Sequence, residues 1–270
     1  MEDTSQKLDT AVFDKSEYFA RIGMESIGAT PDLAGLKLLQ RQHLLNVPFE
    51  NLDIHWKRPI VLDTDRFYQK IVRENRGGFC YELNGLFNEL LREVGFETRL
   101  LSARVASADG GFSPEFDHLS ILVMIGEMQY IADVGFGSFT TEPMRFAGGE
   151  EQIDEAGTFM IRRQDNEHFD VARKDGNEWR SEYMFRPLGH DLSEFAGMCD
   201  FHQTSPESHF MKHKICSILT PSGRKTLTDE KFIVSENGQR TEVAVGSDED
   251  FAGILATEFG IRQNSDLPSV

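Results

Sequence analysis

The sequence predicts an α+β protein made of three consecutive parts, and three observations support this fold class. Residues 1–95 place apolar side chains at helical spacing, residues 96–190 contain short β-rich runs separated by Gly, Asp and Asn, and residues 191–270 mix both patterns. The 270 residues suffice for one large domain or for two to three small ones. Because the chain shows no internal repeat and no low-complexity linker, we place the domain boundaries at these changes of pattern.

Two helices are predicted in the first part before residue 76. The stretch "PDLAGLKLLQRQHLLN" (31–46) puts most of its leucines on one helical face, and the following Pro48 breaks that helix. The stretch "DTDRFYQKIVREN" (63–75) gives a second, shorter helix.

A third helix is predicted to begin within a residue of Cys80, in "ENRGGFCYELNGLFNELL" (74–91). Glu82 falls in its first turn, where a negative charge suits the helix dipole, and Gly95 is placed to adopt the left-handed conformation that ends a helix. Its apolar stripe, at helical spacing, consists of Leu83, Leu86, Phe87, Leu90, Leu91 and Val94. Cys80 is therefore expected at the positive end of an amphipathic helix.

Strands and a closing helix are predicted in the other two parts. In the last part, Asn237-Gly238 indicates a two-residue hairpin turn. Near the end of the chain, Ser247 and Asp250 resemble a capping box at a helix start, and Gly260 resembles its stop. The β-rich segments of the middle part are residues 96–106, 118–125, 128–136 and 167–175.

The net charge restricts the classes of binding partner, and the cysteine content indicates the cellular compartment. The net charge of −17, from 28 Lys+Arg and 45 Asp+Glu, argues against nucleic acid or an anionic membrane as the main partner. The N-terminal stretch lacks the basic and apolar regions of a signal peptide, and the most apolar segment (119–125) is far too short to span a bilayer. Cys80, Cys199 and Cys216 are too few for a disulfide framework, so we expect a reducing, cytoplasmic location. Cys216 is expected in the core.

The segment "DHLSILVMIGEMQYIADVGFG" (117–137) predicts a β-hairpin. Gly126-Glu127 suits a two-residue type II′ turn, in which Ile125 pairs with Met128. A loop with an odd number of residues would reverse which side chains share a face.

This register brings a histidine and an aspartate together. His118 faces Gly135, and Asp133 points to the same face of the sheet as His118. Diagonal neighbours of this kind lie about 7–8 Å apart at Cα, within reach of an imidazole and a carboxylate. Taken alone, the pair fits either a functional site or two polar side chains at the rim of a sheet that only satisfy each other's hydrogen bonds.

Cys80, His118 and Asp133 together offer the nucleophile, base and orienting group of a cysteine triad. A helix N-terminus and a neighbouring imidazole both favour the thiolate. An aspartate on the far ring nitrogen fixes the tautomer and stabilises the imidazolium. Gly77 and Gly78 are expected to let the backbone turn sharply and to leave space over the sulfur.

No metal site is expected. His209 and His213 are four residues apart but lack the acidic motif of a zinc protease, and no other pair shows convincing metal-ligand spacing. Histidines other than His118 receive no role: these are residues 43, 55, 168, 190, 202, 209 and 213.

The motifs around the triad resemble those of the arylamine N-acetyltransferase family. The resemblance rests on "RGGFCYELN" (76–84), "VPFENLD" (47–53), "HLSILV" with "DVGFG" (118–123 and 133–137), and "TSPESHF" (204–210). These motifs occur in the family's order in all three parts of the chain, and the first is highly specific. The triad pattern shows no departure from that of the family.

The resemblance implies a fold and a set of catalytic residues. The fold would be a helical bundle (1–95), a central β-barrel (96–190) and a C-terminal α/β lid (191–270), with a triad similar to that of papain-like and transglutaminase-like enzymes. The nucleophile would be Cys80, the base His118 and the orienting group Asp133.

The resemblance also implies the surroundings of the triad. Arg76 would pair with Glu50 and hold two of the motifs together, and Asn84 would give structural support. The residues expected to line the acceptor pocket are Phe49, Val105, Phe136 and Phe210.

An acidic protein that binds a polyanionic coenzyme needs local compensation, from Lys or Arg or from backbone N–H groups at a turn or helix start. The candidates for such N–H groups are Gly135, Gly137 and a helix start at Thr204-Ser205-Pro206. Ser205 before Pro206 is equally compatible with ordinary helix capping.

The activity implied by the resemblance is transfer of an acetyl group from acetyl-CoA to the nitrogen of arylamines, arylhydrazines or N-hydroxyarylamines. The reaction would run by a ping-pong mechanism through acetyl-Cys80, with acetyl-CoA as co-substrate, without a metal, and in a monomer or homodimer. Such enzymes act in xenobiotic metabolism.

Three alternatives remain open. A thiol hydrolase or transglutaminase-type enzyme would use the same triad with water or with glutamine amides. A CoA-binding regulatory protein would have a silent site. A third variant would use the same fold to close an amide in a macrolactam-type natural product.

Overall fold

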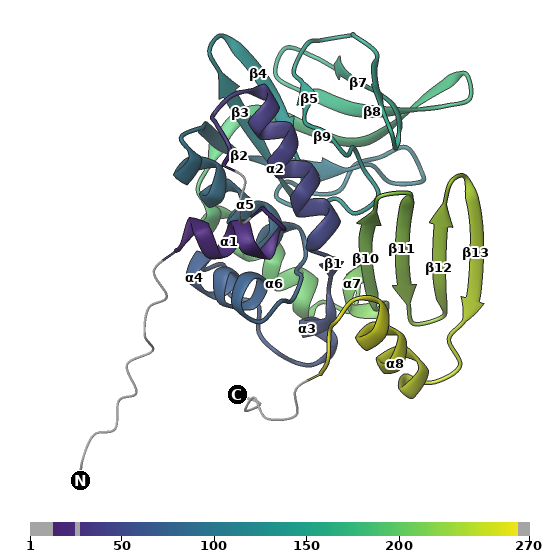
Figure 1. Ribbon diagram of the computed structural model, residues 1–270. Coiled ribbons are helices and arrows are strands. Elements are labelled where there is room, and N and C mark those ends of the chain that lie inside the picture. Colours follow the sequence, from purple (N-terminus) through teal and green to yellow (C-terminus); the bar gives the residue numbers. More distant parts are fainter. Residues whose placement is uncertain (1–12, 25–27, 264–270) are drawn as a thin grey trace.

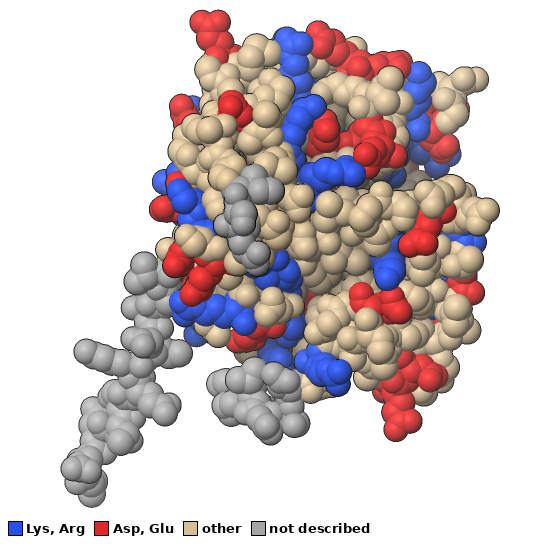
Figure 2. Space-filling view, in the orientation of Figure 1, with Lys and Arg blue, Asp and Glu red and all other residues tan. Residues whose placement is uncertain are grey.

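The computed structural model describes residues 13–24 and 28–263 (Figure 1). The expectation that the chain lacks a signal peptide concerns mainly residues 1–12, which lie outside the described residues. Within the described ranges, no helix is both long and apolar enough to cross a membrane. Acidic and basic side chains are interspersed over the face seen in Figure 2.

Helices dominate the described chain up to residue 95, as predicted. The second predicted helix is split, because its last turn is a π-helix, η1. The elements are α1 (Lys15–Arg21), α2 (Leu33–Asn46), β1 (Phe49–Glu50), α3 (Leu52–His55), α4 (Thr64–Tyr68), η1 (Gln69–Arg73) and α5 (Cys80–Val94).

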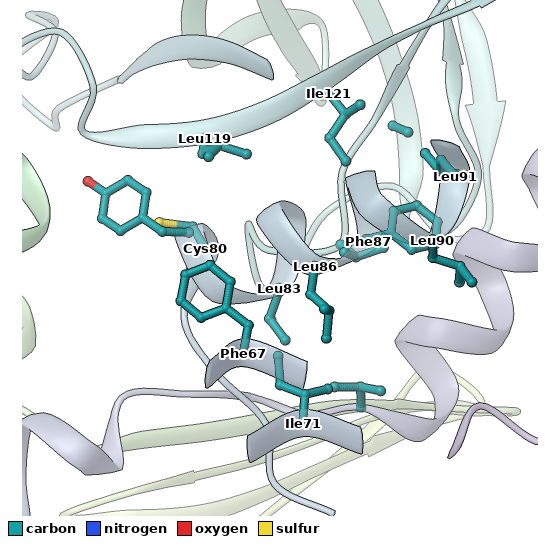
Figure 3. Close-up of a cluster of buried hydrophobic side chains, with 14 of the residues drawn as sticks. Phe67, Ile71, Cys80, Leu83, Leu86, Phe87, Leu90, Leu91, Leu119 and Ile121 are labelled. Atoms are coloured by element: carbon teal, nitrogen blue, oxygen red, sulfur yellow. The ribbon is translucent and has the colours of Figure 1, made fainter. Parts of the chain in front are cut away.

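Helix α5 lies at the centre of the largest hydrophobic core. In Figure 3 it runs between Phe67 and Ile71 on one side and Leu119 and Ile121 of strand β3 (His118–Ile125) on the other. The leucines and the phenylalanine of its apolar stripe are completely buried, and each such side chain contributes roughly 1.5–3 kcal/mol to stability. Gly95 ends the helix with a φ of 108°, as predicted. This packing fixes the start of α5, and therefore Cys80, against the neighbouring sheet.

Eight strands form one antiparallel sheet in the order β5-β4-β3-β2-β9-β8-β7-β6. The backbone N–H of Gly149 donates to the carbonyl of Ile161 (2.8 Å), which links the chain after β5 to β7 and nearly closes the sheet into a barrel. The strands are β2 (Glu97–Val105), β3 (His118–Ile125), β4 (Met128–Ala132), β5 (Met144–Arg145), β6 (Gln152–Asp154), β7 (Gly157–Arg163), β8 (Phe169–Asp175) and β9 (Glu178–His190).

Strand β9 has 13 residues and was not among the predicted strands. Pro187 and Gly189 interrupt its pattern, and both residues are unfavourable inside a regular strand. The structure accommodates them at a register shift opposite Leu101 and Ala103 of β2. Proline is tolerated at such bulges, so the strand continues past it.

The last part of the described chain combines helices with a second sheet, in the order β1-β10-β11-β12-β13. Its first strand, β1, comes from the N-terminal part, so this sheet crosses the predicted boundary between the domains. The division into three domains stays a prediction. The elements are η2 (Leu192–Phe195), α6 (Ala196–Thr204), α7 (His209–Lys212), β10 (Ile215–Thr220), β11 (Gly223–Thr228), β12 (Lys231–Glu236), β13 (Gln239–Ala244) and α8 (Asp248–Glu258).

Two local predictions for this part are confirmed. Asn237 and Gly238 both have positive φ and form the two-residue turn between β12 and β13. Ser247 caps α8 by accepting a hydrogen bond from the backbone N–H of Asp250, and Gly260, just past the helix, has a φ of 69°.

The β3–β4 hairpin has the predicted register. Ile125 pairs with Met128, and Gly126 has a φ of 59°, as a type II′ turn requires. The ladder ends at Ile121 and Ala132, so the expected pairing of His118 with Gly135 does not occur. His118 pairs instead with a residue of β2 on its other side, and the chain beyond β4 bends towards it.

Candidate active site

Cys80 is the first residue of α5 and its side chain is buried, with an exposed fraction of 3 %. The helix start is fixed by Glu82, whose carboxylate accepts a hydrogen bond from the backbone N–H of Phe79 (3.1 Å). This contact satisfies one of the N–H groups that a helix leaves free at its beginning.

Gly77 and Gly78 do not leave open space, which corrects the prediction. A Cβ atom added to Gly77 would lie 2.0 Å from the carbonyl oxygen of Pro48, and one added to Gly78 would lie 2.8 Å from Cβ of Glu82. The two glycines instead allow the chain to approach β1 closely, where the N–H of Glu50 donates to the carbonyl of Gly78 (2.8 Å). The two glycines therefore join the motif at residues 76–84 to the motif at residues 47–53.

His118 and Asp133 meet as predicted. Nε2 of His118 lies 2.7 Å from Oδ2 of Asp133, and both side chains are almost completely buried. The other oxygen, Oδ1, accepts hydrogen bonds from Asn84 Nδ2 and from the backbone N–H of Gly135, each at 2.9 Å. Because a carboxylate only accepts hydrogen bonds, Nε2 of His118 carries a proton, and Nδ1 is the ring nitrogen that remains available.

Asn84 ties this pair to the helix of Cys80. Its Nδ2 also donates to the carbonyl of Leu119 (2.6 Å), and its Oδ1 accepts from the backbone N–H of Val134 (2.9 Å). Asn84 is one turn beyond Cys80 on α5, so a single side chain sets the distances from the helix to β3 and to the segment after β4. Gly135 completes the packing, since a Cβ there would lie 2.8 Å from Cα of Cys80.

Burial raises the pKa of the Cys80 thiol well above its ordinary value. The carboxylates of Asp117 and Asp133 raise it further, while a hydrogen bond from the backbone N–H of Leu119 lowers it. Burial and these two carboxylates therefore oppose formation of the thiolate, whereas the helix start and the imidazole of His118 are expected to favour it. The proton must pass to a neighbouring base for the thiolate to form.

A cavity of about 910 Å³ opens over Cys80 and His118. Its walls come from all three parts of the chain, including α6, β10 and β11. The predicted pocket residues that line it are Phe49, Val105, Gly135, Phe136, Gly137 and Phe210.

Known proteins match this chain along most of its length. A family model described as N-acetyltransferase matches residues 32–267. The arylamine N-acetyltransferase pineal gland isozyme NAT-3 of Gallus gallus is 33% identical over 272 residues, covering 92% of this chain and 94% of the relative. The chain belongs to the arylamine N-acetyltransferase family.

Solved structures of the family share the fold. The arylamine N-acetyltransferase of Salmonella typhimurium superimposes with a TM-score of 0.87 at 30% identity, covering 93% of this chain and 92% of that one. The Mycobacterium marinum enzyme, whose structure was solved in complex with CoA, gives a TM-score of 0.83 at 27% identity, covering 92% and 93%. The predicted family, fold class and enzyme class are confirmed by these matches.

The predicted helix start at Thr204-Ser205-Pro206 is wrong. Thr204 is the last residue of α6, and Ser205 has extended backbone angles because the following proline disfavours the helical region. The next helix starts at His209 and is capped by Ser208. Neither Thr204 nor Ser205 lines the cavity, so neither is kept as a site residue.

Arg224 of β11 was not predicted from the sequence. Its guanidinium lines the cavity and donates to Ser217 Oγ (3.1 Å), and it forms no ion pair with a carboxylate among the described residues. Burial lowers its pKa to about 10, so it still bears a positive charge at neutral pH. No local pattern in the sequence singles out this arginine, because the cavity wall is completed by strands far from Cys80 in the chain.

His202, for which the sequence predicted no role, lies in the cavity wall with Asp117. Nε2 of His202 is 3.2 Å from Oδ1 of Asp117. The aspartate directly precedes His118 in the sequence, which was the available signal, but its partner is 85 residues further along.

Behind Cys80, the predicted pairing of Arg76 with Glu50 is present, with Nη2 2.7 Å from Oε1. It belongs to a larger buried cluster. Lys70 Nζ lies 2.8 Å from both Asp53 and Glu82, and Arg76 also contacts Asp53 at 3.0 Å. We call these five residues the charge cluster; it joins the segment around β1 to the first turn of α5.

Proposed function

We propose that this protein transfers an acetyl group from acetyl-CoA to the nitrogen of arylamines, arylhydrazines or N-hydroxyarylamines, through an acetyl-Cys80 intermediate. The observation that supports this most strongly is the arrangement of Cys80 and the His118–Asp133 pair on one cavity of about 910 Å³. Cys80 is the nucleophile, His118 the base and Asp133 the group that orients the base.

In the first half-reaction, Nδ1 of His118 takes the proton of the Cys80 thiol. The resulting imidazolium is stabilised by Asp133 through Nε2. The thiolate attacks the thioester carbonyl of acetyl-CoA, the bond from the carbonyl carbon to the CoA sulfur breaks, and His118 returns its proton to the leaving CoA thiolate. Exchange of one thioester for another leaves acetyl-Cys80 with little change in free energy.

In the second half-reaction, the acceptor nitrogen attacks the carbonyl carbon of acetyl-Cys80. Arylamines are weak bases and are largely uncharged at neutral pH, so the nucleophilic form is already present. His118 accepts the proton that the nitrogen loses, and passes it to the Cys80 sulfur as the carbon–sulfur bond breaks. Backbone N–H groups near Cys80 are our candidates for stabilising the oxyanion in both steps, because a helix leaves its first N–H groups without partners inside the helix.

Arg224 is our candidate for a contact with the phosphates of the donor. It is a partly buried cation that forms no ion pair with any carboxylate in the described part of the chain, in a protein whose net charge is −17. A polyanionic substrate would supply the missing counter-charge. This assignment replaces the helix start that the sequence suggested for the same purpose.

The Arg224 assignment is tested by two donors that differ in phosphate content. For Arg224→Met, kcat/KM with acetyl-CoA should fall roughly tenfold or more, as expected for loss of a charged hydrogen bond. The value for S-acetyl-pantetheine, which has no phosphate, should not change. Arg240→Met, at an exposed arginine of β13, is the matched control. An equal loss with both donors would refute a phosphate contact.

Initial-rate kinetics test the proposed mechanism. With acetyl-CoA and 4-methoxyaniline both varied, double-reciprocal plots should give parallel lines, because CoA leaves before the acceptor reacts. Without acceptor, CoA release should stop after one equivalent per active site. Continued release would indicate a hydrolase, and intersecting lines would exclude the ping-pong order. No turnover of any small arylamine would favour the amide-closing alternative.

We also propose a cytoplasmic location and keep monomer or homodimer as a prediction. Cys80, Cys199 and Cys216 are all free and buried, which suits a reducing compartment.

A further inference from the structure

A second histidine–aspartate pair faces the cavity that contains Cys80. His202 of α6 and Asp117, just before β3, both line this cavity, and Nε2 of the histidine lies 3.2 Å from Oδ1 of the aspartate. The histidine is buried, with an exposed fraction of 6 %, and 16 % of the aspartate side chain is exposed. The proposed mechanism uses neither residue.

Both members of the pair are held in place. The hydroxyl of Tyr81, the residue after Cys80, donates to the carbonyl of Phe116 (2.7 Å) and lies 3.2 Å from that of Asp117. On the other side, Nδ1 of His202 is 3.4 Å from Ser208 Oγ. Asp117 is therefore fixed relative to the first turn of α5, and His202 is fixed relative to α7.

Asp117 is ionised, and its charge influences the pKa of the Cys80 thiol. Burial opposes its ionisation, but hydrogen bonds from His202 and Ser113 outweigh burial and lower the pKa of this carboxyl. Its negative charge in turn raises the pKa of the Cys80 thiol. A carboxylate offers about four acceptor positions, and these two donors occupy only part of them.

The rest of the cavity near Cys80 is mostly apolar. The one other carboxylate among the described lining residues is Glu207, which is exposed. A substrate N–H or O–H group that enters this cavity next to Asp117 would lose its hydrogen bonds to water. It would then need a hydrogen-bond acceptor of the protein. The aromatic and aliphatic wall consists of Phe49, Val105, Phe136, Met198, Phe201 and Phe210.

We propose that Asp117, positioned by His202, selects the acceptor: it binds a second N–H, O–H or cationic group of the substrate. Aromatic amines and hydrazines that have such a second donor group would be preferred, and those with a carboxylate would be rejected by the like charge of Asp117. This inference rests on the proposed function, since it concerns the acceptor of the second half-reaction.

The test compares acceptors of similar size in the wild-type protein and in Asp117→Asn. The acceptors are 4-phenylenediamine, which has a second donor group, 4-methoxyaniline, which has none, and 4-aminobenzoate, which is anionic. In Asp117→Asn, the ratio of kcat/KM for 4-phenylenediamine to that for 4-aminobenzoate should fall roughly tenfold to hundredfold, the range expected for a charged hydrogen bond. The value for 4-methoxyaniline should change least.

Substitutions at two further positions distinguish selection of the acceptor by Asp117 from a purely structural role of this residue. Glu207→Gln removes the other cavity carboxylate and should leave the ratio unchanged. His202→Gln keeps a hydrogen-bond donor for Asp117 and should retain most of the preference, whereas His202→Leu should lose it. A ratio that is unchanged in Asp117→Asn, or that falls equally in Glu207→Gln, would overturn the proposal.

Failure of this proposal is distinguishable from failure of the proposed function. Each variant is first incubated with acetyl-CoA alone, and the CoA released is measured. One equivalent of CoA from a variant shows that the nucleophile is intact, so its acceptor ratio then tests Asp117 alone. If the wild-type protein releases no CoA, the proposed function itself is wrong.

Discussion

Two buried polar networks meet at the first turn of α5, and they differ in what they leave open. The charge cluster (Glu50, Asp53, Lys70, Arg76 and Glu82) lies on one side of this turn, and none of its members lines the cavity. The triad (Cys80, His118 and Asp133) lies on the other side, with its thiol and imidazole at the cavity wall.

The comparison indicates that access to the cavity, and not density of charge, makes a buried group reactive here. The charge cluster has two cations and three carboxylates, and each of them has a partner of opposite sign. In the triad, both carboxylate oxygens of Asp133 and one nitrogen of His118 are engaged in hydrogen bonds, whereas Cys80 and His118 line the cavity, where a substrate can reach them. We therefore expect substitutions in the triad to reduce activity and substitutions in the charge cluster to reduce stability.

The largest effect is expected for Asp133→Asn. An asparagine at this position can donate its amide hydrogen to Nε2 of His118, which would favour the wrong tautomer and remove the base. We expect kcat/KM for acetyl transfer to fall about 10³–10⁴-fold, as for the corresponding change in a serine protease triad. The melting temperature should change by only a few degrees. A loss of less than tenfold would contradict the role given to Asp133.

Arg76→Met tests the other side of the comparison. It leaves the buried carboxylate of Glu50 without its main partner, which should lower the free energy of unfolding by about 3–5 kcal/mol. Urea denaturation measures this loss. Arg92→Met, at an exposed arginine of the same part of the chain, should change it by less than about 0.5 kcal/mol. If Arg76→Met lost activity while its stability was unchanged, the charge cluster would take part in the chemistry.

Glu82→Gln tests how the stability contributed by the charge cluster depends on pH. Burial raises the pKa of Glu82 to about 7 from its ordinary value of 4.5, although Lys70 opposes this shift. The stabilisation that comes from the raised pKa is complete below about pH 4.5 and is lost as pH rises through about 7. The unfolding free energy of the wild type, relative to the glutamine variant, should therefore decrease across this range by up to about 3 kcal/mol. A difference that stays constant with pH would show that Glu82 titrates normally.

Gly135→Ala should give the smallest effect, on the triad side. The added methyl group would lie 2.8 Å from Cα of Cys80 and from Nδ2 of Asn84, so the start of α5 and the chain after β4 must separate slightly. We expect kcat to fall roughly tenfold, because a small displacement of the nucleophile from its base lowers the rate strongly. Gly197→Ala in α6, where no atom lies within 4 Å of the added group, is the control. Equal rates for the two variants would mean that this close approach is not needed for activity.

The sequence predicted the parts of the site that depend on short-range geometry. The apolar stripe of α5 placed Cys80 at a helix start, and the two-residue turn at Gly126 placed His118 and Asp133 on one face. In both cases the period of a helix or a strand, anchored by one glycine, determines where a side chain points.

The remaining parts depend on contacts between distant segments. The two-residue strand β1 exists because Phe49 pairs with Ser217 of β10, and neither segment alone indicates this pairing. Arg224 and His202 reach the cavity in the same way, from elements far along the chain. Gly77 shows a further limit: the sequence indicated a special position there, but not that the neighbouring Pro48 would fill the space.

The central claim is that Cys80 accepts the acetyl group, and intact-protein mass measured after incubation with acetyl-CoA alone tests it most directly. We predict that the wild type gains the mass of one acetyl group and that 4-methoxyaniline removes it. Cys199→Ala and Cys216→Ala should gain the same mass, and Cys80→Ala should gain none. An absent adduct on the wild type, or an adduct that persists in Cys80→Ala, would contradict the account.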